Sequence, residues 1–147
     1  ATRNKCMIAI DGRPVLKHTL ERAVNAGVDE VVLVVGYKAE EIINAIGNRY
    51  AETPVKYVIQ WEQKGLVHAM ECAAQTIAGS DFILFLGDEL MVNPRHRQQI
   101  EEFSRGGVIA LCGVLWVDNT ELIKRTYTMI QDDNGRIYRL VEKPRNP

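Results

Sequence analysis

The amino-acid sequence predicts an α/β fold with a mainly parallel sheet. Two runs of consecutive apolar residues, Val31–Val35 and residues 82–86, are typical of strands that are buried on both faces, as in parallel sheets. Segments with apolar residues at helical spacing lie between and around these runs. Because a parallel connection needs a crossover, which is usually a helix, this alternation favours a sheet with helices on both faces.

The first half of the chain alternates helix and strand in this way. Pro14 follows a turn and suits the first position of a helix, and Gly27 suits the position just after its end. Pro54 marks the start of a later strand. The predicted elements are a helix over 15–24, a strand over 31–35, a helix over 39–49 and a strand over 55–60.

The second half continues the alternation and ends in a hairpin. Asn134-Gly135 is a strong hairpin-turn signal, so strands are expected over 127–131 and 136–142. The other predicted elements are a helix over 67–77, a strand over 81–86, a short helix over 95–103 and a strand over 108–117. Together they predict a Rossmann-like, three-layer sandwich with a C-terminal β-hairpin, formed by one domain over residues 1–147.

Composition and charge exclude several classes of protein. Apolar residues make up 46% of the chain and charged residues 25%, as in ordinary soluble globular proteins. The 18 basic and 19 acidic residues balance, so no overall field points to nucleic acid or to a membrane surface. Cys6, Cys72 and Cys112 lack C-x-x-C spacing, so we expect buried thiols in a reducing compartment. Without a signal peptide or a membrane-length apolar stretch, we expect a cytoplasmic protein.

Gly87-Asp88-Glu89 follows the predicted strand over 81–86. Open α/β sheets bind their ligands beyond the carboxyl ends of their strands, where Asp88 would lie. Gly87 would allow a sharp backbone turn there, so that Asp88 could offer an oxygen ligand to a divalent metal. The alternative is that Asp88 is a solvated acid in a loop.

A second candidate segment, residues 60–69, follows a strand and opens a helix. Gly65 would allow a ligand to approach the backbone closely, next to the free N–H groups of the helix N-terminus. The amide of Gln60 has a donor and an acceptor, which suits it to reading the edge of a nucleobase. The alternatives are that Gly65 only turns the chain, that Gln60 is only a capping side chain, and that His68 serves in capping or packing.

The third candidate is the pair Glu142-Lys143 at the end of the hairpin. Its carboxylate could hold sugar hydroxyls and its ammonium a phosphate. The alternative is that both charges only keep the end of a hairpin strand soluble.

In this order, these segments resemble the sugar-1-phosphate nucleotidyltransferases, and the resemblance covers nearly the whole chain. Residues 7–16, Met-Ile-Ala-Ile-Asp-Gly-Arg-Pro-Val-Leu, are similar to the segment of that family that leads through Gly-Lys-Pro into its first helix. Residues 26–32 resemble the family's Ala-Gly-Ile strand entry. The pattern is completed by residues 65–69, 86–88 and 141–144.

The resemblance implies an enzyme in which the phosphate of a sugar 1-phosphate attacks the α-phosphorus of a nucleoside triphosphate, pyrophosphate leaves, and a nucleotide-sugar forms. Such a reaction needs charge neutralisation and in-line positioning. Asp88 matches the family's magnesium-binding aspartate, which implies Mg²⁺ as cofactor. Lys5 matches a lysine near the triphosphate, and Arg3 matches an arginine that stabilises the leaving pyrophosphate.

The resemblance also implies how the two substrates are held. Gln60 and Gly65 match positions around the nucleobase, and residues 64–69 look closer to uridylyl- and thymidylyltransferases than to adenylyltransferases. Lys143 matches the lysine that binds the sugar phosphate, and Glu142 the acid that binds sugar hydroxyls. The implied partners are a nucleoside triphosphate and a sugar 1-phosphate, without nucleic acid or membrane, and the implied assembly is a homo-oligomer.

The sequence departs from the family pattern at both ends. The family begins with an apolar strand and a loop ending in Gly-x-Gly-Thr-Arg, whereas this sequence begins Ala1-Thr2-Arg3, and a second metal-binding aspartate of the family lies beyond Pro147. We expect missing segments, because loss of a central strand would strip the sheet of its core. The alternative is an inactive nucleotide- or sugar-phosphate-binding module for regulation or assembly. A generic dinucleotide-binding domain is disfavoured, because no G-x-G-x-x-G follows a first strand.

Overall fold

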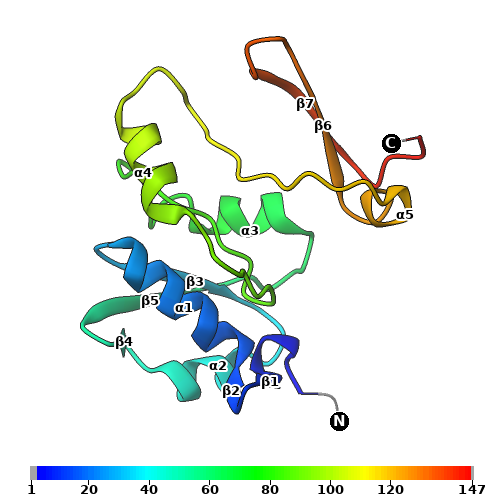
Figure 1. The fold of residues 1–147 in the computed structure, drawn as a ribbon. Helices are drawn as coiled ribbons and strands as arrows, with labels where there is room; N and C mark the ends of the chain where they lie inside the picture. The colour runs from blue at the N-terminus through cyan, green and yellow to red at the C-terminus, as the bar shows by residue number, and fades with distance from the viewer. Residues whose placement is uncertain (1–2, 147) are drawn as a thin grey trace. The chain divides into compact units, whose positions relative to one another are not determined.

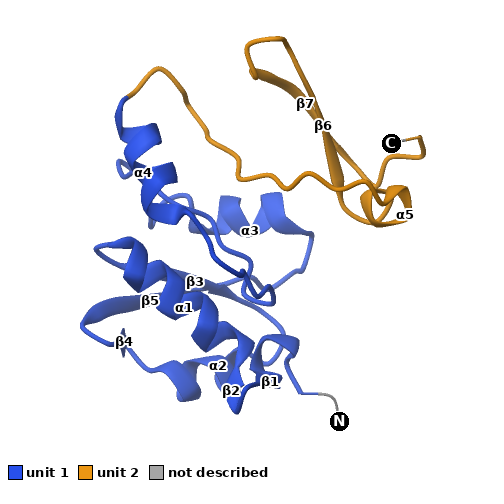
Figure 2. Ribbon diagram, in the orientation of Figure 1, with its two compact units in different colours: residues 1–105 blue, residues 106–147 orange. Residues whose placement is uncertain are grey.

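The computed structural model describes residues 3–146, and the chain divides into two compact units, residues 1–105 and 106–147 (Figure 2). The first unit contains η1 (Lys5–Met7), β1 (Ala9–Ile10), β2 (Arg13–Pro14), α1 (Val15–Ala26), β3 (Val31–Val35), α2 (Ala39–Ile46), β4 (Arg49–Tyr50), β5 (Thr53–Ile59), α3 (Leu66–Ala73) and α4 (His96–Ser104). The second unit contains α5 (Thr120–Ile123), β6 (Tyr127–Gln131) and β7 (Ile137–Glu142).

The centre of the first unit is the parallel pair β3 and β5, which lie side by side in Figure 1. Their register runs from Val31 opposite Val55 to Val35 opposite Ile59, and β4 pairs antiparallel with the start of β5. The backbone N–H of Gln60 donates to the carbonyl of Val35 at 2.7 Å, which continues the pairing past the last residue of β5. The prediction of neighbouring parallel strands is confirmed for this pair.

The core of the first unit lies on one face of this strand pair. In both strands the odd-numbered residues share a face, because strand side chains alternate. Val35 and Val55 are buried on that face, with Leu33, Tyr57 and Ile59 packed against the same cluster. The helices complete the core with two residues each, Leu16 and Leu20 from α1 and Ile42 and Ile46 from α2. The apolar spacing of both predicted helices therefore marks the faces that pack on the sheet, although α2 ends three residues before the predicted boundary.

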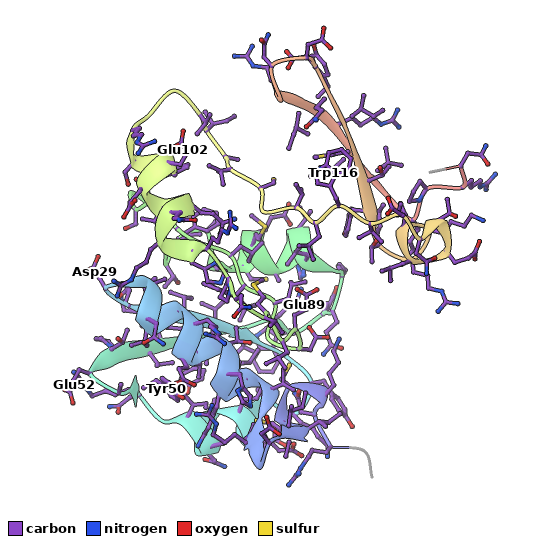
Figure 3. The ribbon with its side chains drawn as sticks, viewed as in Figure 1. Asp29, Tyr50, Glu52, Glu89, Glu102 and Trp116 are labelled. Carbon is purple, nitrogen blue, oxygen red and sulfur yellow. The ribbon has the colours of Figure 1, made fainter. Side chains whose placement is uncertain are left out.

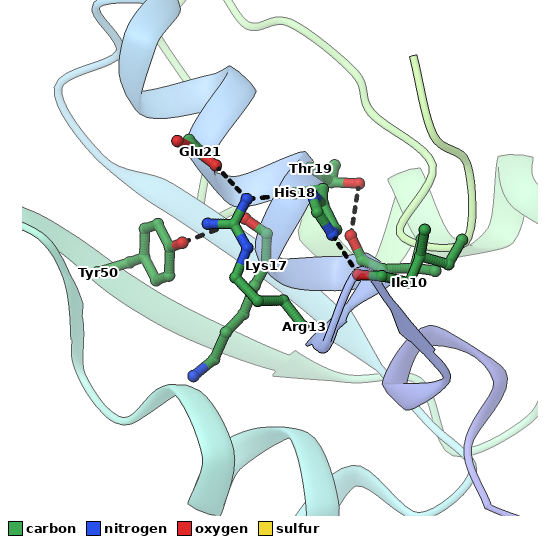
Figure 4. Close-up of polar contacts among 8 residues, drawn as sticks. Ile10, Arg13, Lys17, His18, Thr19, Glu21 and Tyr50 are labelled. Carbon is green, nitrogen blue, oxygen red and sulfur yellow. Dashed lines mark hydrogen bonds and ion pairs between the residues drawn. The ribbon is translucent and has the colours of Figure 1, made fainter. Parts of the chain in front are cut away.

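Polar contacts tie α1 to the short hairpin of β1 and β2, as Figure 4 shows. Arg13 donates to the carboxylate of Glu21 at 3.0 Å and to Nδ1 of His18 at 3.2 Å. A guanidinium can only donate, so Nδ1 of His18 accepts and its Nε2–H donates to the carbonyl of Ile10 at 3.0 Å. Tyr50 of β4 donates its hydroxyl to a backbone carbonyl of α1 at 3.1 Å. Gly27 ends the helix in the left-handed conformation, as predicted.

Two predicted strands, over 81–86 and 108–117, are wrong: neither segment is a strand in the structure. A strand exists through ladder hydrogen bonds to a neighbour, and within residues 3–146 β3 is paired on its β5 side alone. Phe82 is 54% exposed, and in the second segment Leu115 is 89% and Trp116 (labelled in Figure 3) 91% exposed. An apolar run shows that a segment is suited to burial. It does not show that another strand is available to pair with that segment.

The prediction of a mainly parallel sheet is also broader than the structure supports. Apart from β3 and β5, every strand pair in the described part of the chain is antiparallel. These three pairs are antiparallel because each joins strands that are close in sequence and need no crossover helix. The α/β character itself is confirmed, and a sandwich of three layers stays a prediction.

The second unit contains the predicted C-terminal hairpin. Strands β6 and β7 pair antiparallel from Tyr127 opposite Glu142 to Gln131 opposite Ile137, with an irregularity at its turn end. The side chain of Asp132 organises the turn, because its Oδ1 accepts from the backbone N–H groups of Asn134 at 3.0 Å and Arg136 at 2.8 Å. The hairpin prediction is confirmed.

Two further expectations concern single features of the chain. Among residues 3–146 no helix is long and apolar enough to cross a membrane. The prediction of three buried thiols is wrong for Cys112, which is exposed, whereas Cys6 and Cys72 are half-buried. Cys112 is exposed because it belongs to the segment over 108–117 that has no strand partner.

Candidate active site

The carboxyl ends of β3 and β5 lie next to each other and are followed by Gly36 and Gln60. A Cβ added to Gly36 would lie 2.9 Å from the backbone oxygen of Gln60 and 2.9 Å from Nε2 of Gln63. Gly36 is therefore needed for the close approach of the loop after β5 to the end of β3. Gly36 was not among the residues predicted from the sequence. The available signal was a glycine directly after a buried strand.

Replacing Gly36 by alanine is expected to lower the free energy of unfolding by about 1–3 kcal/mol, because the added methyl group forces the loop after β5 to shift. Gly87→Ala is the matched control, since a Cβ there would meet side-chain atoms at an ordinary 3.5 Å, and its cost should stay within about 0.5 kcal/mol. Urea unfolding followed by circular dichroism measures both. Equal costs for the two variants would contradict the close-approach argument.

The segment between β5 and α3 brings Gln60 and Gly65, the two sequence candidates for nucleobase binding, into contact. Nε2 of Gln60 donates to the carbonyl oxygen of Gly65 at 3.2 Å and lies 3.0 Å from Nδ1 of His68. Gly65 directly precedes α3 and has a φ of 92°, a backbone conformation that residues with a Cβ rarely adopt. The three residues form a polar group at the carboxyl end of β5.

Lys5 and Asp88, which lie far apart in the sequence, form an ion pair. Nζ of Lys5 is 2.5 Å from Oδ2 of Asp88, and the two side chains are 75% and 34% exposed. The hydrogen bond to the Asp88 carboxylate, together with its negative charge, raises the pKa of Lys5. The structure thus pairs Lys5, which the resemblance assigns to triphosphate binding, with Asp88, which the resemblance assigns to metal binding.

Asn4 fixes the segment that carries Lys5 at the same edge of the sheet. Its side-chain amide donates to the carbonyl of Tyr37, just beyond β3, at 2.7 Å, and its backbone N–H donates to Glu41 of α2 at 3.2 Å. Its Oδ1 also accepts from the backbone N–H of Cys6 at 3.0 Å. Asn4 is buried and was not predicted as a site residue. The available signal was an asparagine at the start of a short helix.

Arg3, the remaining candidate near the triphosphate, lies within electrostatic reach of Glu41. The hydrogen bond from Lys38 is the largest cause that lowers the pKa of Glu41, followed by the bond from the backbone of Asn4 and the charges of Lys38 and Arg3. Arg3 therefore belongs to the group of residues around the start of α2.

Cys6 packs against the turn that carries Asp88. A Cβ added to Gly87 would lie 3.5 Å from Sγ of Cys6, and Gly87 does not have a positive φ. Gly87 and Asp88 lie in a turn, as the sequence predicted, but this turn does not need the left-handed conformation that glycine favours. Burial is the main cause that raises the pKa of the Cys6 thiol, and the charge of Asp88 raises this pKa further while Lys5 lowers it.

Cys6 is expected to react with iodoacetamide at pH 8 more slowly than the exposed Cys112, because the thiolate is the reactive form and a raised pKa keeps Cys6 protonated to higher pH. In Asp88→Asn, Cys6 should react faster than in the wild type, since one cause of its raised pKa is removed. Peptide mass spectrometry over a time course measures both rates. Reaction of Cys6 ahead of Cys112 would contradict the described environment.

The donor set for a metal at this edge is small. Among residues 3–146 no group of three or more His, Cys, Asp and Glu side chains could hold a metal ion. Asp88 offers one partly exposed carboxylate. Mg²⁺ is commonly held by one or two carboxylates together with substrate phosphates, so Asp88 fits a site that a bound triphosphate completes.

Glu142 and Lys143 lie in the second unit, at the end of β7. Their side chains form an exposed ion pair at 3.2 Å, and the backbone N–H of Lys143 donates to the carbonyl of Thr126 at 2.7 Å. Lys143 has a φ of 46°, which is uncommon for a residue with a side chain. A strained residue at a strand end is a common feature of ligand sites.

Comparison with known proteins identifies the family. The model of the family described as nucleotidyl transferase matches residues 1–147. The UTP–glucose-1-phosphate uridylyltransferase AglF of Haloferax volcanii is 35% identical over 97% of this chain and 58% of its own length. The glucose-1-phosphate thymidylyltransferase of Streptomyces antibioticus is 29% identical over 99% of this chain and 40% of its own length. The chain thus spans less than two thirds of these relatives.

Solved structures agree with this assignment. HddC from Yersinia pseudotuberculosis, complexed with GMP-PN, superposes with a TM-score of 0.69 at 26% identity, over 99% of this chain and 63% of that one. A Bacillus anthracis protein assigned as a glucose-1-phosphate thymidylyltransferase reaches a TM-score of 0.80 at 16% identity, over 98% of this chain and 57% of that one, which shows the shared fold. The chain therefore belongs to the sugar-1-phosphate nucleotidyltransferase family.

Proposed function

We propose that this chain takes part in the transfer of a uridylyl or thymidylyl group from a nucleoside triphosphate to a sugar 1-phosphate, with release of pyrophosphate. One observation supports this most strongly. The Lys5–Asp88 pair and the Gln60–Gly65 pair lie at the carboxyl edge of the same two parallel strands. Open α/β sheets bind ligands at this edge, and the two pairs offer the charges and the amide that a nucleoside triphosphate needs.

In the proposed reaction an oxygen of the sugar phosphate forms a bond to the α-phosphorus of the triphosphate. The bond between the α-phosphorus and the bridging oxygen breaks, and pyrophosphate leaves with the electron pair. The protein has little acid–base chemistry to supply, because both the nucleophile and the leaving group are already anions. Its task is to hold three anionic groups close together and in line.

Lys5, Arg3 and Asp88 divide the electrostatic part of that task. Lys5 is exposed enough to turn from Asp88 to a phosphate, and its ammonium group would offset charge on the triphosphate. Arg3 would offset charge on the departing pyrophosphate. Asp88 would hold Mg²⁺ through its carboxylate, and the ion when bound would neutralise phosphate charge.

Glu142 and Lys143 are the candidates for holding the sugar 1-phosphate in this proposal. Lys143 would bind the phosphate of the sugar 1-phosphate and Glu142 the sugar hydroxyls. Glucose 1-phosphate is the first sugar to test, because the relatives from Haloferax volcanii and Streptomyces antibioticus are named for it.

A binding module without catalysis is the second candidate. Two observations favour it. Among residues 3–146 no group of three or more potential metal ligands is present, and the ammonium group of Lys5 already pairs with the carboxylate of Asp88. Such a module would bind a nucleoside triphosphate without turning it over.

The test measures pyrophosphate release from five nucleoside triphosphates with glucose 1-phosphate and other sugar 1-phosphates, with and without Mg²⁺. Equilibrium dialysis of the same nucleotides is measured in parallel. Release that needs both substrates and the metal supports the transferase. Binding without release favours the module, and the absence of both overturns the proposed use of this edge.

A further inference from the structure

The orientation of the Gln60 amide is determined by its contacts. The carbonyl oxygen of Gly65 can only accept a hydrogen bond, so the atom of Gln60 that lies 3.2 Å away must be the donor Nε2. The reverse orientation would place two oxygens against each other. Gln60 therefore keeps one amide orientation as long as the segment between β5 and α3 holds its shape.

The same amide nitrogen determines the proton position on His68. Nε2 of Gln60 has no lone pair to offer, so Nδ1 of His68, 3.0 Å away, must accept. The ring is then neutral and carries its proton on Nε2, which lies 3.9 Å from Sγ of Cys72. An imidazolium at His68 would place two donors against each other.

These contacts leave one group of the Gln60 amide for a ligand. Both amide hydrogens are directed within the protein, toward Gly65 and His68. In the described part of the chain no donor contacts the amide oxygen, Oε1 of Gln60. A hydrogen-bond acceptor at this place suits a base whose ring carries an N–H, as uracil and thymine do, whereas the corresponding ring nitrogen of cytosine is itself an acceptor.

We propose that His68 is a positioning residue for nucleobase recognition. Its neutral ring holds the amide of Gln60 with the oxygen available to the ligand, and this selects bases with a ring N–H. The role rests on the proposed function, because it assigns Gln60 to the nucleobase. It differs from the packing role weighed for His68, since packing alone requires neither a proton position on the ring nor an acceptor at Nδ1.

The test compares UTP with CTP, which are alike in size and differ in the donor at this ring position. Dissociation constants are measured for the wild type, His68→Leu and His68→Asn. Leucine removes the acceptor, so the preference for UTP over CTP should fall by about fivefold, the equivalent of one hydrogen bond. Asparagine offers an oxygen close to the place of Nδ1 and should retain the preference.

His18→Leu is the matched control. His18 also accepts at Nδ1 from a side-chain donor, but its contacts are to Arg13 and Ile10, so the ratio of the two dissociation constants should not change. An unchanged ratio in His68→Leu overturns the proposal, and so does a loss in His68→Asn equal to that in His68→Leu.

A measurement without nucleotide separates this proposal from the proposed function. Two-bond ¹H–¹⁵N correlation spectra of the histidine rings report which ring nitrogen carries the proton, and His68→Leu identifies the signal. The Nε2–H form is expected for His68 in the free protein, and the Nδ1–H form would overturn the positioning role even if UTP binds. If UTP and CTP both fail to bind while the Nε2–H form is seen, the proposed function fails and the base-selection role fails with it.

Discussion

Replacing Asp88 by asparagine is expected to lower the rate of pyrophosphate release by about 10²–10³-fold, the range seen when one preorganised electrostatic group is removed from an active site. The amide keeps the size of the side chain but loses the charge that would hold Mg²⁺ and that now pairs with Lys5. The carboxylate is partly exposed, so the variant should fold. Steady-state release at saturating UTP, glucose 1-phosphate and Mg²⁺ measures the effect.

Glu89→Gln is the control for that experiment, because it removes a neighbouring carboxylate without touching the Lys5 pair. Glu89, labelled in Figure 3, contacts Thr19 through its backbone carbonyl, which accepts from the threonine hydroxyl at 3.2 Å, and this contact survives the substitution. Its rate should stay within about twofold of the wild type, as surface changes usually cost little. Equal losses in both variants would show that general negative charge, and not the position of Asp88, is what matters.

The local parts of the fold could be predicted from the sequence because they depend on local patterns. The apolar face of α1 and the run of Val31–Val35 each carry their own periodicity, and the hairpin turn near Asn134 carries its own turn chemistry. The runs over 82–86 and 108–117 have equally apolar composition, but a strand also needs a partner. No pattern within a segment reports whether that partner exists.

The residues of the candidate site also differ in whether local sequence patterns could predict them. Gln60 and Gly65 are five residues apart on one strand–helix connection, so their meeting follows from local structure. Lys5 and Asp88 come together only in the folded chain, and the resemblance gave each a separate role without predicting that they pair. Asn4 was missed because an asparagine at the start of a helix indicates a cap, but this pattern does not report that the side chain is buried and also bonds the segment after β3.

Replacing Leu20 by alanine is expected to lower the free energy of unfolding by about 3 kcal/mol, within the range for leucine-to-alanine changes in protein cores. Leu20 is 2% exposed and lies in the cluster where α1 and α2 meet β3 and β5. Both the lost burial and the cavity left beneath α1 contribute. A domain of ordinary stability has only about 5–15 kcal/mol in total, so this one change would remove a large part of it.

Far-UV circular dichroism in a urea titration is the suitable measurement, because Trp61 and Trp116 are 87% and 91% exposed and their fluorescence would change little on unfolding. Leu115→Ala makes the same chemical change at a residue that is 89% exposed and should cost less than about 0.5 kcal/mol. If Leu20→Ala cost no more than Leu115→Ala, the core described for the first unit would be wrong. The expected difference matters for the site as well, because the same cluster of residues holds β3 and β5 in the register that brings Gly36 beside Gln60.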